Sequence, residues 1–533
     1  MTDFCLNSML NKNMLNKNMQ YQIVEFWQKI ISYDKQIHQL ETDLFSILDT
    51  IKFNLEKQIS IDNSWMKCLE IMFSLIVFVR DIDQGLGQRQ LTYMMLYVWY
   101  KQYPILAVYA LEILVTVQDG NNMSYGSWRD IPGLCQYIYN RCGDHPFITT
   151  AIEMMNKQLY RDWIIFQEHF FQEQTIFQEE NYKVSESAFL KMGISNACKW
   201  IPRENSQFKW LFQPMVLNWS WTHTPYILRS AQSSTQYARA INKCSQHYRR
   251  MVSKMTLVLD PIECKQCANQ EDQINIANIT TNALVKYWSL SKISDLYTDN
   301  QIDTLQKDNL ENSDNSEINY LINSSTYGKY VQYAIQYLNT NDCKNDDITK
   351  LNQRWAYISK KWIKKHSKMM VKMVNCLPII HIQNIQSIHD PKLYSAIAQA
   401  CLISEYSNLG HRILFAGNQP IWINLGQCNG FVSYIQTIFD TIQGNGLYNI
   451  LCPNLELAFS TIRLGLQMND VNIQVVVLDN SIIHMPKSVI DPVIVQDNTI
   501  THDNITHSFD NICKILSQSR YTSVANRFAL ITQ

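Results

Sequence analysis

Residues 79–104 read VRDIDQGLGQRQLTYMMLYVWYKQYP. An apolar run over residues 71–79 leads into this stretch, and Gly85 and Gly87 then interrupt the apolar pattern. From residue 88 to residue 102, apolar side chains return at the spacing of an amphipathic helix. The stretch therefore predicts two helices joined by a glycine-containing elbow.

Charged side chains gather at this elbow. Arg80, Asp81, Asp83 and Arg89 lie close together in the sequence, on both sides of the two glycines. An elbow between packed helices can hold such charges when they pair with one another or cap helix ends. We favour this structural role over a catalytic one.

Length and composition limit the class of protein. A chain of 533 residues is too long for one hydrophobic core, so two or three domains are expected. The hydrophobic content of 46% excludes wholesale disorder, and the net charge of −1 does not by itself indicate a partner. The 14 cysteines lack framework spacing, and the CxxC pair of Cys264 and Cys267 has no second ligand pair. We therefore expect reduced thiols inside the cell and neither zinc nor any other cofactor.

The sequence carries no recognisable export or membrane signal. Its N-terminus lacks a basic start and a continuous apolar core. The apolar runs over residues 71–79 and 105–117 are too short to span a bilayer. These features predict a soluble, cytoplasmic protein without a membrane partner.

The first half of the chain reads as helical. Residues 1–20 resemble a flexible tail, and residues 21–290 contain successive segments with helical spacing of apolar side chains. No strict sequence period recurs among them, which fits a loose superhelix of HEAT-type helical repeats. The expected architecture is an all-α helical-repeat domain.

Residues 183–259 are strongly basic, with eleven Lys or Arg residues against two Glu residues. Aromatic residues, including Trp200 and Trp210, are interleaved with these cations. Such a mixture suits nucleic acid, because cations contact phosphates while aromatic rings stack on unpaired bases. A solvated basic face over an ordinary aromatic core explains the pattern equally well. The strongest candidates for phosphate contacts are Lys199, Arg203, Lys209, Arg249 and Arg250.

The charge reverses in residues 291–318, which are acidic and rich in asparagine and predict a linker or surface insert. Residues 319–372 follow as a helical connector whose second half is basic. Lys361 and Lys365 share one face of the predicted helix, so we add both to the nucleic-acid candidates.

Residues 373–533 alternate between predicted strands and helices. Strands are expected over residues 376–382, 412–416, 421–425 and 473–479, with helices between them. This alternation predicts a doubly wound α/β domain of Rossmann type with a mostly parallel sheet. Ligands of such sheets bind at the carboxyl ends of the strands.

Several segments together resemble a known family. RDIDQGLGQR (80–89), YGSWRDI (125–131), KWIPRE (199–204) and YRRMVSKM (248–255), followed by the α/β pattern, resemble proteins in which a TROVE- or HEAT-like helical region precedes a von Willebrand factor A-like domain. The family is distantly similar to Ro ribonucleoproteins and has relatives in large DNA viruses. The resemblance therefore implies RNA as a partner and a location in host cytoplasm or a virion.

The resemblance also implies a metal site, which can be tested residue by residue. The family places Asp-x-Ser-x-Ser after the first strand, a Thr in a later loop and an Asp after a further strand, as oxygen ligands for Mg²⁺. Only the last of these positions keeps its residue type in this chain, where the aligned residues are His381, Gln383, Ile385, Pro453, Asn454 and Asp479. We therefore expect a degenerate site without metal.

Two functions remain open. The first is non-catalytic RNA binding, as in a ribonucleoprotein. The alternative is a protein-interaction scaffold, such as a virion or assembly component, that contacts protein partners through the α/β domain. An enzyme is not expected, because no nucleophile, base and orienting group can be assembled from the sequence.

Overall fold

The computed structural model divides the chain into two compact units, one of residues 1–274 with 508–533 and one of residues 275–507. The structure describes residues 18–30, 37–57, 64–81, 85–117, 124–176, 193–259, 261–268, 270, 320–321, 324–339, 345–365, 376–382, 387–445, 454–466, 474–479, 482–483, 487–488, 509–510, 512–517 and 519–532.

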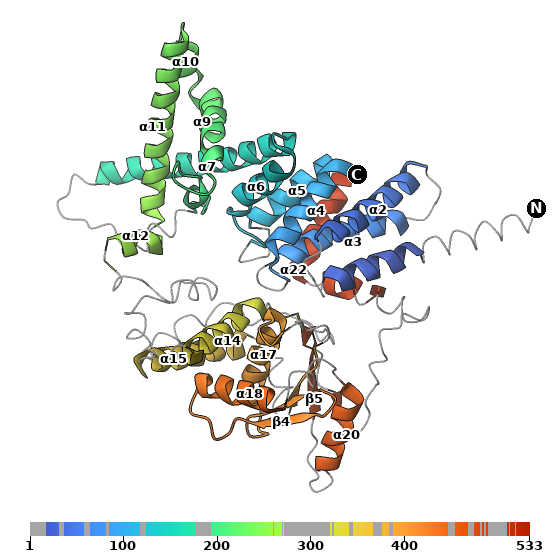
Figure 1. The fold of residues 1–533 in the computed structure, drawn as a ribbon. Coiled ribbons are helices and arrows are strands. Elements are labelled where there is room, and N and C mark those ends of the chain that lie inside the picture. The colour runs from blue at the N-terminus through green and yellow to red at the C-terminus, as the bar shows by residue number, and fades with distance from the viewer. Residues whose placement is uncertain are drawn as a thin grey trace, which may run out of the picture. The chain divides into compact units, whose positions relative to one another are not determined.

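The first unit is helical (Figure 1). A helix over residues 18–30 comes first, so the last residues of the predicted tail are helical and Met19 is buried. The elements that follow are α2 (Ile37–Glu56), α3 (Ser64–Arg80), α4 (Arg89–Gln102), α5 (Pro104–Val115), α6 (Asp130–Cys142), α7 (Pro146–Ile176), η1 (Cys198–Trp200), α9 (Lys209–His223), α10 (Pro225–Arg229), α11 (Ser234–Val258), α12 (Ile262–Cys267) and α22 (Ser519–Thr532).

Helix α3 lies at the centre of the first half of this unit. Every residue of this helix from Ile71 to Arg80 is buried, and the helix packs against α2, α4, α5 and α22. A helical segment that is apolar all round has to be covered on every side, which explains why four helices contact it. The glycine elbow ends it as predicted: Gly85 passes within van der Waals contact of the Phe78 carbonyl, and Gly87 has a φ of 64°. A Cβ at residue 85 would collide with that carbonyl.

A single buried amide ties together the second half of the unit. The Nδ2 atom of Asn156 on α7 donates to the Met215 carbonyl at 3.0 Å and to Asn218 Oδ1 at 2.8 Å, both on α9. The hydroxyl of Tyr248 on α11 donates to Asn156 Oδ1 at 2.9 Å. Because the amide is buried, each of these bonds forms away from competing water. They anchor the hairpin of α9, α10 and α11 on α7.

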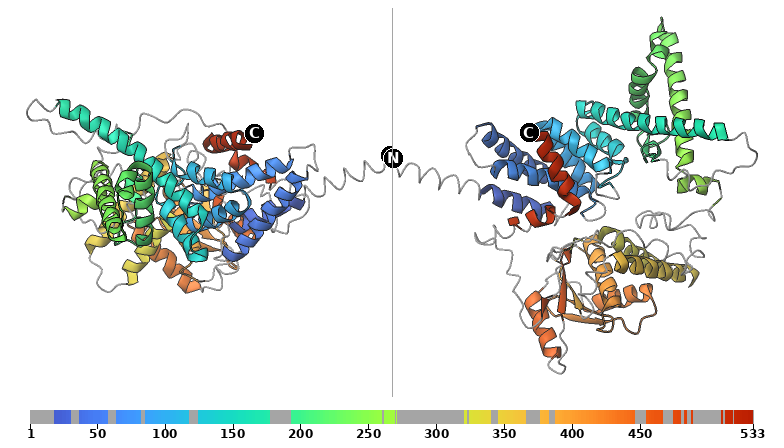
Figure 2. Two further views of the ribbon diagram at one scale, coloured as in Figure 1. Left: turned by 90° about the horizontal axis from the view of Figure 1, so that it is seen from above. Right: turned by 180° about the vertical axis from the view of Figure 1, so that it is seen from behind.

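The C-terminal helix belongs to the helical unit. Helix α22 packs against α3 and α5, and Figure 2 shows it lying among the N-terminal helices. Phe528 contacts Phe73 of α3 with ring centroids 5.3 Å apart. The sequence pattern predicted an α/β domain that continues to residue 533. Residues 508–533 belong to the helical unit instead. The apolar face of α22 finds its partner in α3, and sequence order gives no sign of such a return.

The second unit contains a mixed sheet. Its strands run in the order β1 (Tyr320–Leu321), β6 (Ile482–Ile483), β5 (Gln474–Asp479), β2 (Cys376–Ile380), β3 (Arg412–Phe415) and β4 (Ile421–Asn424), and β7 (Lys487–Ser488) also pairs with β5. Strand β2 is parallel to β3 and β5, whereas the other described pairs are antiparallel. The prediction of a mostly parallel sheet is therefore wrong outside these three central strands. A tight turn reverses the chain between β3 and β4, and no crossover helix separates them.

Helices pack on both faces of the sheet. One face is covered by α14 (Ser324–Asn339), α17 (Pro391–Tyr406) and α18 (Phe431–Asn445), and the other by α20 (Leu455–Leu466). Successive residues of β2 alternate between the two cores, with Ile380 on the first face and Ile379 on the second. The predicted strands and helices of residues 376–479 are all present.

The predicted basic connector is part of the α/β unit. Helix α15 (Asn345–Lys365) packs on α18, and Trp355 stacks on Phe431 with ring centroids 3.7 Å apart. Trp355 also donates its Nε1 hydrogen to Glu405 of α17 at 2.7 Å. Helices α14 and α15 therefore serve the core of this unit. The acidic stretch 291–318 lies outside the described residues.

Candidate nucleic-acid interface

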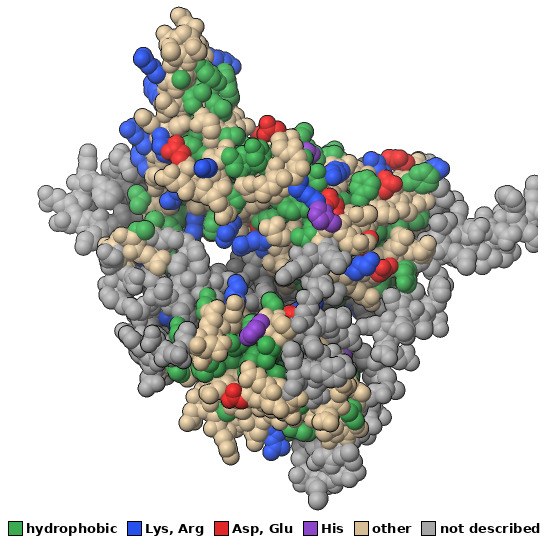
Figure 3. Space-filling model, in the orientation of Figure 1, with side chains coloured by type: hydrophobic (Ala, Val, Ile, Leu, Met, Phe, Trp, Pro, Cys, Tyr) green, Lys and Arg blue, Asp and Glu red, His purple; other side chains and the backbone are tan. Residues whose placement is uncertain are grey.

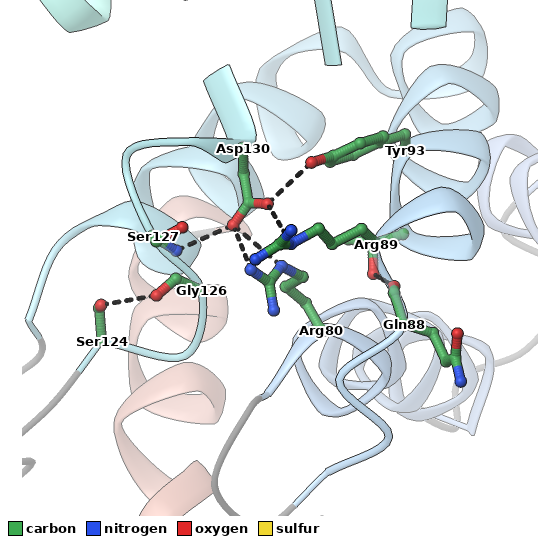
Figure 4. Close-up of polar contacts among 9 residues, drawn as sticks. Arg80, Gln88, Arg89, Tyr93, Ser124, Gly126, Ser127 and Asp130 are labelled. Carbon is green, nitrogen blue, oxygen red and sulfur yellow. Dashed lines mark hydrogen bonds and ion pairs between the residues drawn. The ribbon is translucent and has the colours of Figure 1, made fainter. Parts of the chain in front are cut away.

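The charged elbow resolves into two buried networks, and Asp130 is the centre of the first (Figure 4). Its Oδ2 atom accepts from Arg80 Nε at 2.9 Å and from the Ser127 backbone N–H at 2.8 Å. Its Oδ1 atom accepts from the Tyr93 hydroxyl at 2.8 Å, and Arg89 lies 3.9 Å away. Burial and then Asp130 raise the pKa of Tyr93, so this phenol is a permanent donor. The predicted pairing of the elbow charges with one another is wrong for Arg80 and Arg89, because both approach Asp130 at the start of α6 instead.

Two glycines of the YGSWRDI segment and α6 permit this network. A Cβ on Gly126 would lie 2.5 Å from Asp130 Oδ2, and its backbone N–H bonds to the Leu114 carbonyl at 2.8 Å. A Cβ on Gly133 would lie closer to the Tyr93 hydroxyl than Cβ atoms in proteins approach other heavy atoms. Both positions therefore require the absence of a side chain so that buried polar atoms can meet.

The second network joins the elbow to the C-terminal helix. The Asp81 carboxylate accepts two hydrogen bonds from the Arg520 guanidinium, at 2.6 and 2.7 Å, and one from the Tyr521 hydroxyl at 2.9 Å. The Tyr125 hydroxyl donates to the Arg520 carbonyl, and the Arg520 guanidinium lies 4.9 Å from the centroid of the Tyr125 ring. This bidentate, buried geometry is structural. Asp83 lies outside the described residues.

Four cations form a stripe on the exposed face of α11, which we call the basic stripe. Their spacing of four, seven and four residues places them on one side of a helix, opposite the buried face of Tyr248 and Met251. Within the described residues none of them forms an ion pair, and Figure 3 shows Lys and Arg side chains along this hairpin, at the top of the picture. The stripe consists of Arg239, Lys243, Arg250 and Lys254.

The predicted candidates on this hairpin divide into different environments. Arg250 belongs to the basic stripe, whereas its neighbour Arg249 points away from the stripe and pairs with Glu204 at 2.9 Å. Arg203 and Lys209 are exposed at the turn before α9 and at its first residue. Lys199 is half-buried in η1, with its Nζ atom 5.7 Å from the centroid of the Trp200 ring.

The two tryptophans that we paired with these cations already have protein partners. Trp210 stacks on Tyr139 at 4.2 Å and donates to Gln136 Oε1 at 2.7 Å. The Arg129 guanidinium lies over the Trp200 ring, with its central carbon 5.3 Å from the ring centroid. The aromatic side chains exposed on the hairpin are instead Trp221, Tyr226 and Tyr237, which are 47%, 70% and 37% exposed.

Sequence reasoning therefore passed over three members of the stripe. Arg239, Lys243 and Lys254 belong to the basic region but are not among the candidates that the sequence predicts. Their signal was the regular helical spacing with Arg250, together with the scarcity of acids. Across residues 193–258 nine Lys or Arg residues accompany one acidic residue, Glu204.

The described positions aligned with the metal site, His381, Asn454 and Asp479, lie near the carboxyl ends of the central strands. His381 follows β2, its backbone N–H bonds to the Leu478 carbonyl of β5 at 3.0 Å, and burial lowers the pKa of its imidazole. Asn454 bonds through its backbone N–H to the Ala416 carbonyl at 3.3 Å, and its side chain caps α20 by accepting from the Leu457 N–H at 2.9 Å.

Asp479 is the last residue of β5, and its side chain lies outside the described part of the structure, as do Gln383, Ile385 and Pro453. Among the described residues, no group of three or more His, Cys, Asp and Glu side chains could hold a metal ion. Lys361 and Lys365 belong to α15, and their side chains lie outside the described part of the structure.

No helix in the described part of the chain combines the length and apolar character needed to cross a membrane. Comparisons of the chain with protein-family models, with curated proteins and with solved structures found no match. A helical region followed by a small mixed sheet is compatible with the architecture that the sequence resemblance implies. Identification of a TROVE-like or von Willebrand factor A-like domain stays a hypothesis.

Proposed function

We propose that the protein binds RNA without catalysing a reaction, and that the basic stripe of α11 contacts the phosphates. The observation that carries this proposal is the exposure, on one helix face of a hairpin almost without acids, of four cations that pair with no carboxylate in the described part of the chain. Arg239 and Lys254 are separated by about 22 Å along the helix at 1.5 Å per residue, enough for several phosphates of one strand. A solvated face would also tolerate cations, but it would not exclude acids.

Single-stranded or looped RNA fits the hairpin best. Trp221, Tyr226 and Tyr237 expose large parts of their rings on the same hairpin as the basic stripe. Exposed aromatic side chains beside cations suit unpaired bases, which are free to stack on them, whereas duplex bases are not. The proposal therefore favours sequence-tolerant binding dominated by the phosphate backbone.

Replacing all four cations of the basic stripe with glutamine tests the proposal. Binding of a single-stranded RNA should weaken strongly, and the slope of log K against log salt should fall by about 0.7 for each lost phosphate contact. The matched control replaces Lys157 and Arg161, two exposed cations on α7, with glutamine. Circular dichroism checks that both variants stay folded.

Two single variants sharpen this test. Arg250→Gln should weaken binding, whereas Arg249→Gln should have a smaller effect because Arg249 is engaged by Glu204. Unchanged affinity and salt slope in the folded four-residue variant would contradict RNA binding by this face. The protein-interaction scaffold, in a virion or assembly complex, would then be the better hypothesis.

We further infer that the α/β unit is a degenerate von Willebrand factor A-like domain that contacts proteins without a metal. Support comes from helices on both faces of a sheet with a parallel β5–β2–β3 centre, and from the non-acidic residues His381 and Asn454 at aligned positions. Calorimetric titration with Mg²⁺ should give no saturable heat. A saturable signal that Asp479→Ala abolishes would contradict this inference.

A further inference from the structure

A hollow of about 430 Å³ opens in the helical unit, away from the basic stripe. Helices α2, α4 and α6 and the turn before α9 supply its walls. Its volume lies within the range of small-molecule sites, roughly 300–1,000 Å³. Among the described residues that line it, none is acidic. Its charged and aromatic lining residues include Arg89, Tyr93, Arg129, Tyr137, Arg141 and Phe208.

The guanidinium groups of the hollow are not equally engaged. Arg141 is held by Glu41 at 2.5 Å and donates to the Tyr137 hydroxyl at 2.8 Å, so it forms a fixed wall. Among the described residues, Arg89 approaches a carboxylate only at Asp130, at 3.9 Å. The oxygens of Asp130 are already occupied by Arg80, Tyr93 and the Ser127 N–H, so Asp130 neutralises Arg80 first.

Arg129 is the second uncompensated cation. Its guanidinium lies over the Trp200 ring at 5.3 Å, and within the described residues no carboxylate pairs with it. Stacking on an indole fixes the plane of a guanidinium but leaves the N–H groups on its edge available. Burial and then the charge of Arg80 lower the pKa of Arg89, Asp130 opposes them, and Arg129 lowers it further, as expected where cations outnumber carboxylates.

Charge and shape together define the missing ligand. With Arg80 matched by Asp130 and Arg141 matched by Glu41, two positive charges remain, on Arg89 and Arg129. A phosphate monoester carries about −1.5 to −2 charges at pH 7 and offers three acceptor oxygens. Planar side chains also line the hollow. The Tyr93 and Tyr137 ring centroids lie 6.4 Å apart, and Phe208 is half-buried at the rim.

We propose that this hollow binds a phosphate monoester attached to a planar base, with Arg89 and Arg129 as the phosphate ligands. A nucleoside 5′-phosphate and the 5′-phosphorylated end of an RNA share this chemistry. The site uses none of the basic-stripe residues, so it does not depend on the function proposed above. Arg129 contacts Trp200 of the KWIPRE segment, which gives that segment a place beside the ligand.

The full-length protein can be titrated with adenosine 5′-monophosphate and with adenosine in a calorimeter. A parallel arm compares a short RNA with a 5′-phosphate to the same RNA with a 5′-hydroxyl. We expect the phosphorylated probe to bind and its dephosphorylated partner to bind at least about tenfold more weakly, since charge-assisted hydrogen bonds to both arginines are lost. Binding of the mononucleotide assigns a free nucleotide, and binding of the phosphorylated RNA alone assigns an RNA end.

Variants decide whether the hollow is responsible. Arg129→Gln and Arg89→Gln should each weaken binding of the phosphorylated probe at least about tenfold. The exposed control Arg161→Gln should leave that affinity unchanged. The four-residue basic-stripe variant should also retain mononucleotide binding, which separates this site from the first proposal. Should Arg89→Gln fail to fold, Arg129→Gln and Arg89→Lys carry the test. Equal binding of phosphorylated and dephosphorylated probes, or undiminished binding by folded Arg129→Gln, would overturn the proposal.

Discussion

The elbow between α3 and α4 and the hairpin of α9–α11 use cations in opposite ways. At the elbow, Arg80 and the distant Arg520 are buried, and each is matched by a carboxylate with short hydrogen bonds. On the hairpin, Arg239 and Lys254 are exposed and have no acidic partner among the described residues. A buried cation must be paired because water cannot solvate it, whereas an exposed cation is free to meet an external anion.

This contrast separates buried, paired cations from exposed cations, a distinction that the sequence alone does not make. The elbow motif RDIDQGLGQR is the most distinctive stretch of the chain, yet its Arg80 and Asp81 are buried in ion pairs that hold helices together. The hollow lined by Arg89 and Arg129 lies between these extremes, because part of its charge is matched and part is not. Three measurements test how far pairing and burial explain the difference.

The largest effect is expected at Asp130. Replacing it with alanine leaves Arg80 buried without its carboxylate and removes the acceptor of the Tyr93 hydroxyl. Breaking a buried ion pair by removing one partner costs about 3–5 kcal/mol of unfolding free energy. Urea denaturation of Asp130→Ala measures this loss, with hydrogen exchange in α3 and α6 to locate it.

The matched control is the exposed pair of Glu204 and Arg249. Glu204→Ala should lower the unfolding free energy by about 0–1 kcal/mol, since solvent already screens that pair. The double variant Arg80→Met, Asp130→Leu should recover part of the loss, because no unpaired buried charge remains. An Asp130→Ala loss no larger than that of Glu204→Ala would show that burial does not distinguish the two regions.

A smaller, local effect is expected at Asn156, which holds the hairpin on α7. Asn156→Leu keeps the volume but leaves the buried Tyr248 hydroxyl and the Met215 carbonyl without this partner. An unsatisfied buried polar group costs about 1–3 kcal/mol. Hydrogen exchange should therefore accelerate in α9 and α11 while α3 keeps its protection. Asn242→Leu on the exposed face of α11 is the control, and equal acceleration in α3 would contradict a local anchor.

The smallest effect concerns a buried carboxyl held by hydrogen bonds. Glu405 accepts from Trp355 and Ser359, each at 2.7 Å, and burial raises its pKa although both hydrogen bonds lower it. A carboxyl with a raised pKa in the folded state stabilises the fold below its unfolded pKa of about 4.3. That contribution is lost as the pH rises through the folded pKa.

As the pH rises above the unfolded pKa of Glu405, the melting temperature of the α/β unit should therefore fall less in Glu405→Gln than in the natural sequence. Glutamine stays neutral and can still accept from Trp355, so the variant should be as stable as the natural protein at pH 7, or slightly more stable. Asp440→Asn on the exposed face of α18 should leave the pH profile unchanged. Identical pH profiles for Glu405→Gln and the natural sequence would refute the role of burial.

Some of the candidate site could be predicted from sequence and some could not. The density of cations between residues 183 and 259 directed attention to the hairpin that carries the proposed contacts, and the 100° rotation between neighbouring helical residues explains why Arg249 and Arg250 point in different directions. The choice of Lys199 and Lys209 relied on adjacent tryptophans, and those rings are used within the protein. Adjacency in sequence does not reveal which face of an aromatic ring is already covered.

The sequence by itself determined the helices of the first half, the glycine elbow, the strands of residues 376–479 and the scarcity of acids on the hairpin. These are local properties, set by apolar periodicity, glycine geometry and composition. Only the tertiary structure decided that Asp81 pairs with Arg520, that α15 packs on α18, and that Arg89 and Arg129 face one hollow. Such pairings join residues far apart in the chain, and their stability depends on burial, which no local pattern encodes.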